Sequence, residues 1–300
     1  INLFSPHTEK FTHYSSTWGD KVAFISGFTP GKLLISLFSK GVFVFNPATG
    51  EKQPFTIIDK ETTTRLCNRG KSVNLYQNTP NTVLFLGDHI YQYHLKEKKF
   101  STITEEEGKD IVGTLVPFDH QENLTYINDI KHIYELDDQT SRLKTVFECY
   151  TDTVISSVSH DEQGHFWIGS NFGLIHYDPV LKSRTLVPTN LFTEINMVLC
   201  DQKGKVWIGV DNMLFAYFIK EQKFVLFGES NGAIQNEYLP NARLVNEQGD
   251  AYIGGVKGML RIDGQLLLNT SEMPELQLLD ITINGESANH EWYNHPAKIS

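Results

Sequence analysis

The 300-residue sequence has little cysteine, no long apolar run and no excess of positive charge, and each shortage excludes a class of protein. Three cysteines, Cys67, Cys149 and Cys200, provide neither a disulfide framework nor a paired metal-ligand spacing. The formal net charge of −10 argues against nucleic-acid binding, which needs basic patches. No apolar stretch approaches the ~20 residues that span a bilayer.

Motifs of catalysis and of metal binding are also missing. The sequence holds no G-x-S-x-G elbow, no H-E-x-x-H pair and no phosphate-binding loop. The glycine-rich stretch at Gly254–Gly258 joins two expected strands instead of opening a helix, so we interpret it as a turn. The eleven histidines are scattered, and pairs five residues apart face opposite sides of a strand. We therefore expect no catalytic residue, no metal and no cofactor.

What the sequence does contain is a repeat. The stretch "GHFWIGSNFGLIHYD" at Gly164–Asp178 returns as "GKVWIGVDNMLFAYF" at Gly204–Phe218. Four weaker copies make six in all, and successive markers lie 51, 41, 41, 40 and 45 residues apart. The six marker residues are Leu34, Phe85, Tyr126, Trp167, Trp207 and Tyr252.

Each unit alternates apolar and polar residues over short runs, which is the pattern of β-strands. Turn residues with a glycine, such as those at 161–164, precede the marker strand. In the Trp167 unit we expect an inner strand at Ile155–Ser159, the marker strand, a third at Leu174–Tyr177 and an outer strand near Arg184–Val187. Six tandem four-stranded units predict a β-propeller. The Trp167 column is expected between blades, and Cys200 on an inner strand as a small packing residue.

The repeat resembles that of the two-component regulator propeller family, "D-x-x-G-x-x-W-I-G" followed by "G-L-I-H-Y-D-P". The last unit, Asn231–Asp263, resembles the closing blade of that family's sensors. Met273–Ser287 is similar to the first strand of the small immunoglobulin-like domain, named for three tyrosines, that follows it. The matching positions are Asp161, Gly164, Trp167, Ile168, Gly169, Gly173, Leu174, Tyr177, Asp178 and Pro179.

The resemblance implies an all-β chain with a seven-bladed propeller, of which six four-stranded blades are complete and one is partial. Residues 1–14 are expected to end a preceding or partial blade, 15–271 to form the propeller blades, and 272–300 to begin a β-sandwich. The chain is expected to be a piece of a longer protein.

The same resemblance implies a function: the ligand-sensing and signal-transmitting region of a bacterial hybrid two-component histidine kinase. Many such sensors detect oligosaccharides released from glycans and control polysaccharide-utilisation genes through a phosphorelay. The expected location is periplasmic, in an inner-membrane protein whose membrane and kinase segments lie outside this stretch. The expected partners are an oligosaccharide and a second copy of the chain. The stretch itself is expected neither to be an enzyme nor to contact nucleic acid.

Propeller geometry suggests where a ligand would bind. Turns between second and third strands, and connections between blades, open on one face. Amides and carboxylates beside exposed aromatic rings suit sugars, although the same residue types also cap turns. The candidate ligand-binding residues are Trp18 and Phe172 for ring contacts, and Arg69, Asn212 and Glu237 for polar contacts.

Two other functions stay open at the level of sequence. One is a propeller enzyme, such as a lyase or a glycoside hydrolase; a retaining or inverting glycosidase would need two carboxylates about 5–10 Å apart. A propeller that acts only as a rigid dimerisation or docking scaffold would bind no small molecule and would carry a large apolar patch.

Overall fold

The computed structural model describes residues 1–5, 7–8, 10–14, 20–55, 73–87, 89–104, 115–121, 123–265, 282–283 and 286–287. The chain divides into two units, Ile1–Gln265 and Leu266–Ser300. In the second unit only the short pair β26 (Thr282–Ile283) and β27 (Glu286–Ser287) is described. The predicted sandwich at 272–300 therefore lies almost wholly outside the described residues, and it stays a prediction together with the other domain boundaries.

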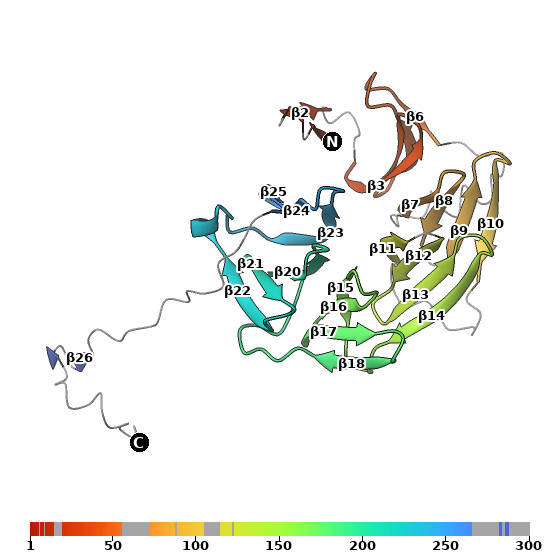
Figure 1. Cartoon of the computed structure of the whole chain (residues 1–300). Helices are drawn as coiled ribbons and strands as arrows, with labels where there is room; N and C mark the ends of the chain where they lie inside the picture. The colour runs from red at the N-terminus through yellow and green to blue at the C-terminus, as the bar shows by residue number, and fades with distance from the viewer. Residues whose placement is uncertain are drawn as a thin grey trace. The chain divides into compact units, whose positions relative to one another are not determined.

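The first unit is built from antiparallel sheets whose strands follow one another in chain order. Figure 1 shows these sheets side by side around a common axis, with the first strand of each toward the centre. The strands of the six blades, in chain order, are β3 (Val22–Thr29), β4 (Lys32–Leu37), β5 (Gly41–Phe45), β6 (Lys52–Pro54); β7 (Asn74–Thr79), β8 (Thr82–Leu86), β9 (Ile90–His94), β10 (Lys99–Ile103); β11 (Val116–Gln121), β12 (Leu124–Asn128), β13 (His132–Asp137), β14 (Arg142–Glu148); β15 (Ile155–His160), β16 (Phe166–Ser170), β17 (Gly173–Asp178), β18 (Ser183–Leu186); β19 (Met197–Cys200), β20 (Lys205–Val210), β21 (Met213–Phe218), β22 (Lys223–Phe227); and β23 (Tyr238–Val245), β24 (Ala251–Gly255), β25 (Gly258–Ile262).

The prediction of seven blades is wrong, because the structure has six. Five blades have four strands, and the sixth has three among the described residues. Residues expected to end a further blade form only a two-stranded hairpin, β1 (Asn2–Ser5) and β2 (Lys10–His13). The repeats in the sequence themselves number six; the seventh blade rests on the family resemblance and on residues 1–14.

The turn before the marker strand in the fourth and fifth blades is explained by one side chain and one glycine. In the fourth blade Asp161 Oδ1 accepts the backbone N–H groups of Gln163 and His165, both at 2.9 Å. Asp201 does the same in the fifth blade. The fourth turn residue has positive φ, 85° at Gly164 and 82° at Gly204, a conformation that a Cβ atom disfavours. The D-x-x-G pattern therefore encodes this capped turn.

The aromatic marker lies between blades, as predicted. Trp167 is only 3% exposed, and its ring centre lies 5.6 Å from that of Tyr217 in the next blade. The glycine two residues after it lies against the following blade. A Cβ atom on Gly169 would come within 2.7 Å of Ile195 and 2.9 Å of Val198. The W-I-G motif thus places a large aromatic ring in the contact between blades and, two residues later, a glycine where the next blade leaves no space for a side chain.

Serine hydroxyls join the inner strands of neighbouring blades. Ser157 and Ser159 on β15 accept the backbone N–H groups of Val198 and Cys200 on β19, at 3.1 and 2.9 Å. Ser26 on β3 accepts the N–H of Gln77 on β7 at 2.8 Å. These bonds satisfy backbone donors that strand pairing within a blade leaves over. Cys200 is buried, as predicted for a packing residue.

Arg243, on β23, connects three blades at the centre. Its guanidinium donates to the backbone carbonyls of Val198 on β19 and Val158 on β15, and its Nε donates to Pro240 O at 2.7 Å. Burial lowers the pKa of Arg243 to about 10, so the group stays charged at neutral pH. It therefore acts as a cross-link between the inner strands of the last three blades.

Helix is almost absent from the described residues. The structure has one single 3₁₀ turn, Glu229–Asn231, among them. No helix in the described part of the chain is long and apolar enough to cross a membrane.

The contact of Gly169 with the next blade gives a test of inter-blade packing. We expect Gly169→Ala to lower the free energy of unfolding by about 1–3 kcal/mol, because the added methyl overlaps Ile195 and Val198. Gly87→Ala is the matched control, since no atom lies within 4 Å of its Cβ position. It should change stability by less than about 1 kcal/mol. Equal effects of the two in urea unfolding would contradict this packing.

Arg243 gives a second test. Arg243→Met removes the donors to three carbonyl groups, and we expect a loss of at least about 2 kcal/mol in the free energy of unfolding. The control is Arg184→Met, because Arg184 is exposed and lies over the Tyr150 ring at 3.8 Å. This control should cost less than about 1 kcal/mol. An Arg243→Met protein as stable as the parent would show that the cross-link does not stabilise the fold.

Candidate functional site

Three of the five predicted ligand-binding residues are described, and Trp18 and Arg69 lie outside the described residues. Phe172 is in the β16–β17 turn and is 54% exposed. Asn212, in the β20–β21 turn, and Glu237, just before β23, are also exposed. All three lie at the end of the blades that carries the turns between second and third strands, which we call the turn face.

The structure brings Asn212 and Glu237 together but leaves Phe172 in a neighbouring blade. The backbone N–H of Asn236, next to Glu237, donates to Asn212 O at 3.2 Å. Neither the Asn212 amide nor the Glu237 carboxylate forms a side-chain hydrogen bond with another described residue. Two polar groups of the turn face are therefore available for a ligand.

Other polar side chains on the turn face are occupied in capping. The Asn171 amide bonds both Val154 N and Asp152 O, at 2.8 and 3.0 Å. The Asn236 amide likewise accepts from Lys257 N at 2.9 Å. Lys131 Nζ donates to two carbonyls of the connection between the third and fourth blades. Each turn is thereby tied to the connection beside it, which accounts for these residues without a ligand.

A cavity of about 1170 Å³ lies between the inner strands. It is lined by residues of β3, β7, β11, β15, β19 and β23 and by turns that follow β19 and β23, among them Tyr76, His160, Gln202 and Arg243. These turns are at the opposite end of the blades from the turn face. None of the five predicted residues lines the cavity. The sequence contained a weak signal for this cavity. Polar residues on the expected inner strands are not explained by exposure at the outer surface, so they indicate a polar space at the centre.

Ionisable pairs surround this cavity. His160 Nδ1 is 3.0 Å from Asp119 Oδ2, and His120 Nε2 is 3.0 Å from Asp138 Oδ2. Burial is the main cause that raises the pKa of Asp138 above its ordinary value, and it raises the pKa of Tyr76 to about 12. The cavity is therefore bordered by both hydrogen-bond donors and hydrogen-bond acceptors.

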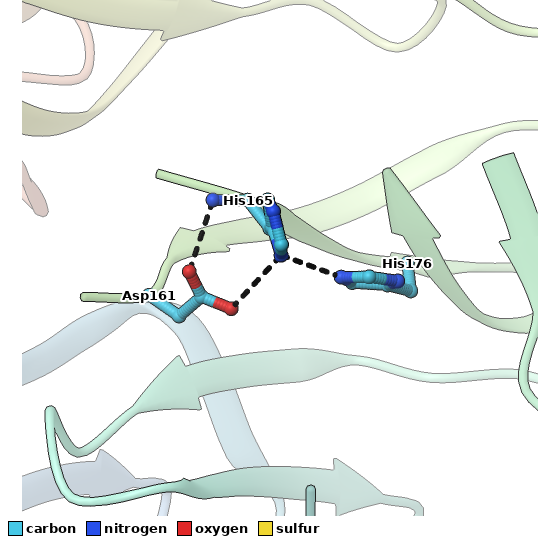
Figure 2. A group of neighbouring side chains, drawn as sticks. All are labelled: Asp161, His165 and His176. Carbon is cyan, nitrogen blue, oxygen red and sulfur yellow. Dashed lines mark hydrogen bonds and ion pairs between the residues drawn. The ribbon is translucent and has the colours of Figure 1, made fainter. Parts of the chain in front are cut away.

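A second group of polar side chains lies in the fourth blade. Asp161 and His165 belong to the β15–β16 turn, and His176 lies on β17, opposite Trp167 on β16. Figure 2 shows the three side chains pointing toward one another. His165 Nδ1 is 3.0 Å from His176 Nε2 and 3.8 Å from Asp161 Oδ2. We call these three residues the histidine cluster.

Burial lowers the pKa of His176, and the neighbouring His165 lowers it further, so its imidazole is neutral at neutral pH. The histidine cluster borders a cavity of about 470 Å³. Sequence reasoning missed this group because the two histidines are eleven residues apart and meet only through strand pairing. The register of the β16–β17 hairpin was the signal that could have found them.

Comparisons with known proteins identify the fold. No protein-family model matches the chain, and no curated protein matches it. Among solved structures, the extracellular domain of BT3049 from B. thetaiotaomicron, classed as a hybrid two-component system, is 14% identical with a TM-score of 0.61. That match covers 81% of this chain and 34% of the other.

Two structures of the extracellular domain of BT4673 from the same organism also match. One, classed as a one-component system, is 17% identical with a TM-score of 0.60 and covers 83% of this chain and 33% of that one. The other, classed as a hybrid two-component system, is 12% identical with a TM-score of 0.53. That match covers 87% of this chain and 36% of the other. This chain thus spans about a third of the chains it matches. At these identities the likeness establishes the β-propeller fold, which these extracellular sensor domains share.

Proposed function

We propose that this chain is part of the extracytoplasmic ligand-sensing and signal-transmitting region of a bacterial hybrid two-component sensor. The observation that carries the proposal is the propeller fold that it shares with the extracellular domains of BT3049 and BT4673. The repeat motif around Trp167, which resembles the two-component regulator propeller repeat, supports the same function independently of the fold comparison. The region would lie in the periplasm and be anchored to the inner membrane by segments outside this stretch.

The ligand we propose is an oligosaccharide derived from a glycan, bound on the turn face. A sugar ring needs a flat apolar surface and nearby hydrogen-bonding groups, because its faces are apolar and its edges carry hydroxyls. Phe172 offers an exposed ring. Asn212 and Glu237 offer an amide and a carboxylate that the described residues do not occupy, unlike the capping amides of Asn171 and Asn236. Trp18 and Arg69 remain candidates on the same grounds of sequence.

Signal transmission requires two arrangements that the ligand distinguishes. We propose that the complete region forms a homodimer, and that the oligosaccharide binds one arrangement of the two copies more tightly than the other. Only such a difference in affinity can shift the equilibrium between arrangements. The shift would then control a phosphorelay and the transcription of polysaccharide-utilisation genes.

Calorimetric titration of the complete extracytoplasmic region with a panel of glycan-derived oligosaccharides tests the sensor proposal. We expect one oligosaccharide to bind saturably and to be recovered intact after the titration. If no glycan binds, the proposed ligand class is wrong. If the oligosaccharide is cleaved during the titration, the region is an enzyme instead of a sensor.

Substitutions on the turn face test where the ligand binds. Phe172→Ala should weaken binding about tenfold or more, equivalent to ~1.4 kcal/mol, because the exposed ring is lost. Leu226→Ala is the matched control, since Leu226 is 52% exposed on the outer strand β22, away from the turns. Asn241→Ala, at the central cavity, serves as a second comparison. Loss of binding in Asn241→Ala alone would place the ligand in the cavity and contradict the turn-face proposal.

A further inference from the structure

The histidine cluster holds two imidazoles and a carboxylate at the separation of ligands around a metal ion. Its three ligand atoms, one from each residue, all lie within 4.8 Å of one another. We propose that the cluster is a binding site for a divalent transition-metal ion of the zinc class, held by Asp161 Oδ2, His165 Nδ1 and His176 Nε2. Nothing in the sequence motif or in the fold comparison assigns such a site.

The distances fit a small tetrahedral ion. Zinc binds imidazole nitrogen and carboxylate oxygen at about 2.0–2.2 Å, which places neighbouring tetrahedral ligands about 3.3 Å apart. The two separations measured from His165 Nδ1, 3.0 Å to His176 and 3.8 Å to Asp161, lie on either side of this value. Small side-chain rotations are therefore enough to form the site.

The ligands are held in place before any ion binds. Asp161 Oδ1 is fixed by two backbone N–H groups, and Oδ2 accepts the indole N–H of Trp167 at 2.8 Å. The His176 ring lies against the Trp167 ring, with centres 4.5 Å apart. Side chains that are already held in this way lose less conformational entropy when an ion binds.

A further carboxylate lies close to the other nitrogen of His165. Its Nε2, the nitrogen not assigned to the metal, is 3.6 Å from Asp178 Oδ2. Asp178 is itself fixed, because its Oδ1 accepts the N–H groups of Val180 and Leu181. Metal-binding histidines commonly pair their second nitrogen with a carboxylate, which fixes the tautomer and raises the basicity of the ligand.

Space remains for a fourth ligand. The cavity of about 470 Å³ beside the cluster is lined by Asp161, His165 and His176 together with residues of the fifth blade such as Lys205 and Ile219. Sites with three protein ligands keep their fourth position for water or for an external donor. The structure thus supplies three protein ligands beside a cavity that a fourth ligand can enter.

Comparison among the blades shows that the repeat does not need these histidines for folding. In the fifth blade the positions of Asp161, His165 and His176 are taken by Asp201, Lys205 and Ala216. There Lys205 Nζ pairs with Asp201 Oδ2 at 3.0 Å.

The sixth blade uses another cation at this place. At the positions of His165 and His176 it carries Asp250 and Arg261, which form an ion pair at 2.9 Å. The cluster position in the fifth and sixth blades therefore combines a carboxylate with a fixed cation. The fourth blade combines the carboxylate with two imidazoles, and a bound metal ion would supply the positive charge that lysine or arginine supplies elsewhere.

Zinc titration of the 300-residue chain, treated with a chelator and then freed of it, tests the proposal. We expect one Zn²⁺ ion to bind per chain, measured by calorimetry. Replacement of the cluster by the residues of the fifth blade, His165→Lys with His176→Ala, should weaken binding at least a hundredfold while the fold is kept. Circular dichroism and urea unfolding check the fold of this variant.

Two further variants separate a metal site from a purely structural network. His94→Ala should leave zinc binding unchanged, because His94 bonds Ser101 in the second blade, outside the cluster. Asp178→Asn keeps the Oδ1 acceptor for the turn but removes the charge beside His165, and should weaken binding about tenfold.

Cobalt serves as a spectroscopic probe of the same site. Co²⁺ bound by the parent chain should give the intense visible absorption of tetrahedral coordination, and the double variant should not. Absence of saturable zinc binding would overturn the proposal. So would zinc binding that persists unchanged in the double variant, because the ion would then be held elsewhere.

Discussion

The structure depends on the contact between successive blades. Both faces of a central four-stranded sheet carry apolar side chains, and only the sheets on either side can keep them from water. Between the fourth and fifth blades this seam holds the Trp167 ring, the side-chain-free surface of Gly169 and two serine hydroxyls that bind backbone N–H groups. Trp167 fills the space between the blades, and the absence of a side chain at Gly169 lets their strands approach closely. This close approach allows the serine hydroxyls to accept N–H groups of the next blade.

Much of this fold could be predicted from the sequence because the unit is repeated. The six marker residues give the six blades, and alternation gives the strands, with β15, β17 and β18 found within two residues of the expected bounds. The aromatic column was correctly placed between blades. The prediction of a seventh blade was wrong because it took its blade number from a family that the repeat resembles, whereas the chain itself contains six repeats.

Interactions that cross between strands and blades could not be predicted in the same way. Arg243 bonds carbonyls 45 and 85 residues away, a separation that no local pattern encodes. His165 and His176 meet only once the register of β16 and β17 is fixed.

On the turn face, the sequence indicated residue types that suit a sugar. It could not distinguish Asn171, which caps a connection, from Asn212, whose amide stays available. Burial and hydrogen-bond partners decide such cases, and both come from the assembled ring.

The two ends of the blades differ in what they offer. The turn face carries Phe172, Asn212 and Glu237, which we propose as contacts for an oligosaccharide. The opposite end carries the turns that reach the central cavity and the histidine cluster, where we propose a metal ion. Both sites lie on a scaffold that holds its shape only if adjacent blades stabilise each other.

Native-state hydrogen exchange tests that dependence directly. The amides of Val198 and Cys200 donate to serines of the preceding blade, whereas those of Ser159 and Trp167 face each other in the β15–β16 pair within one blade. If the seam stabilises both blades, mild urea should expose all four amides in one cooperative opening with the same free energy. Exchange of Val198 and Cys200 through a separate opening of much lower free energy, while the fourth blade stays protected, would contradict the account.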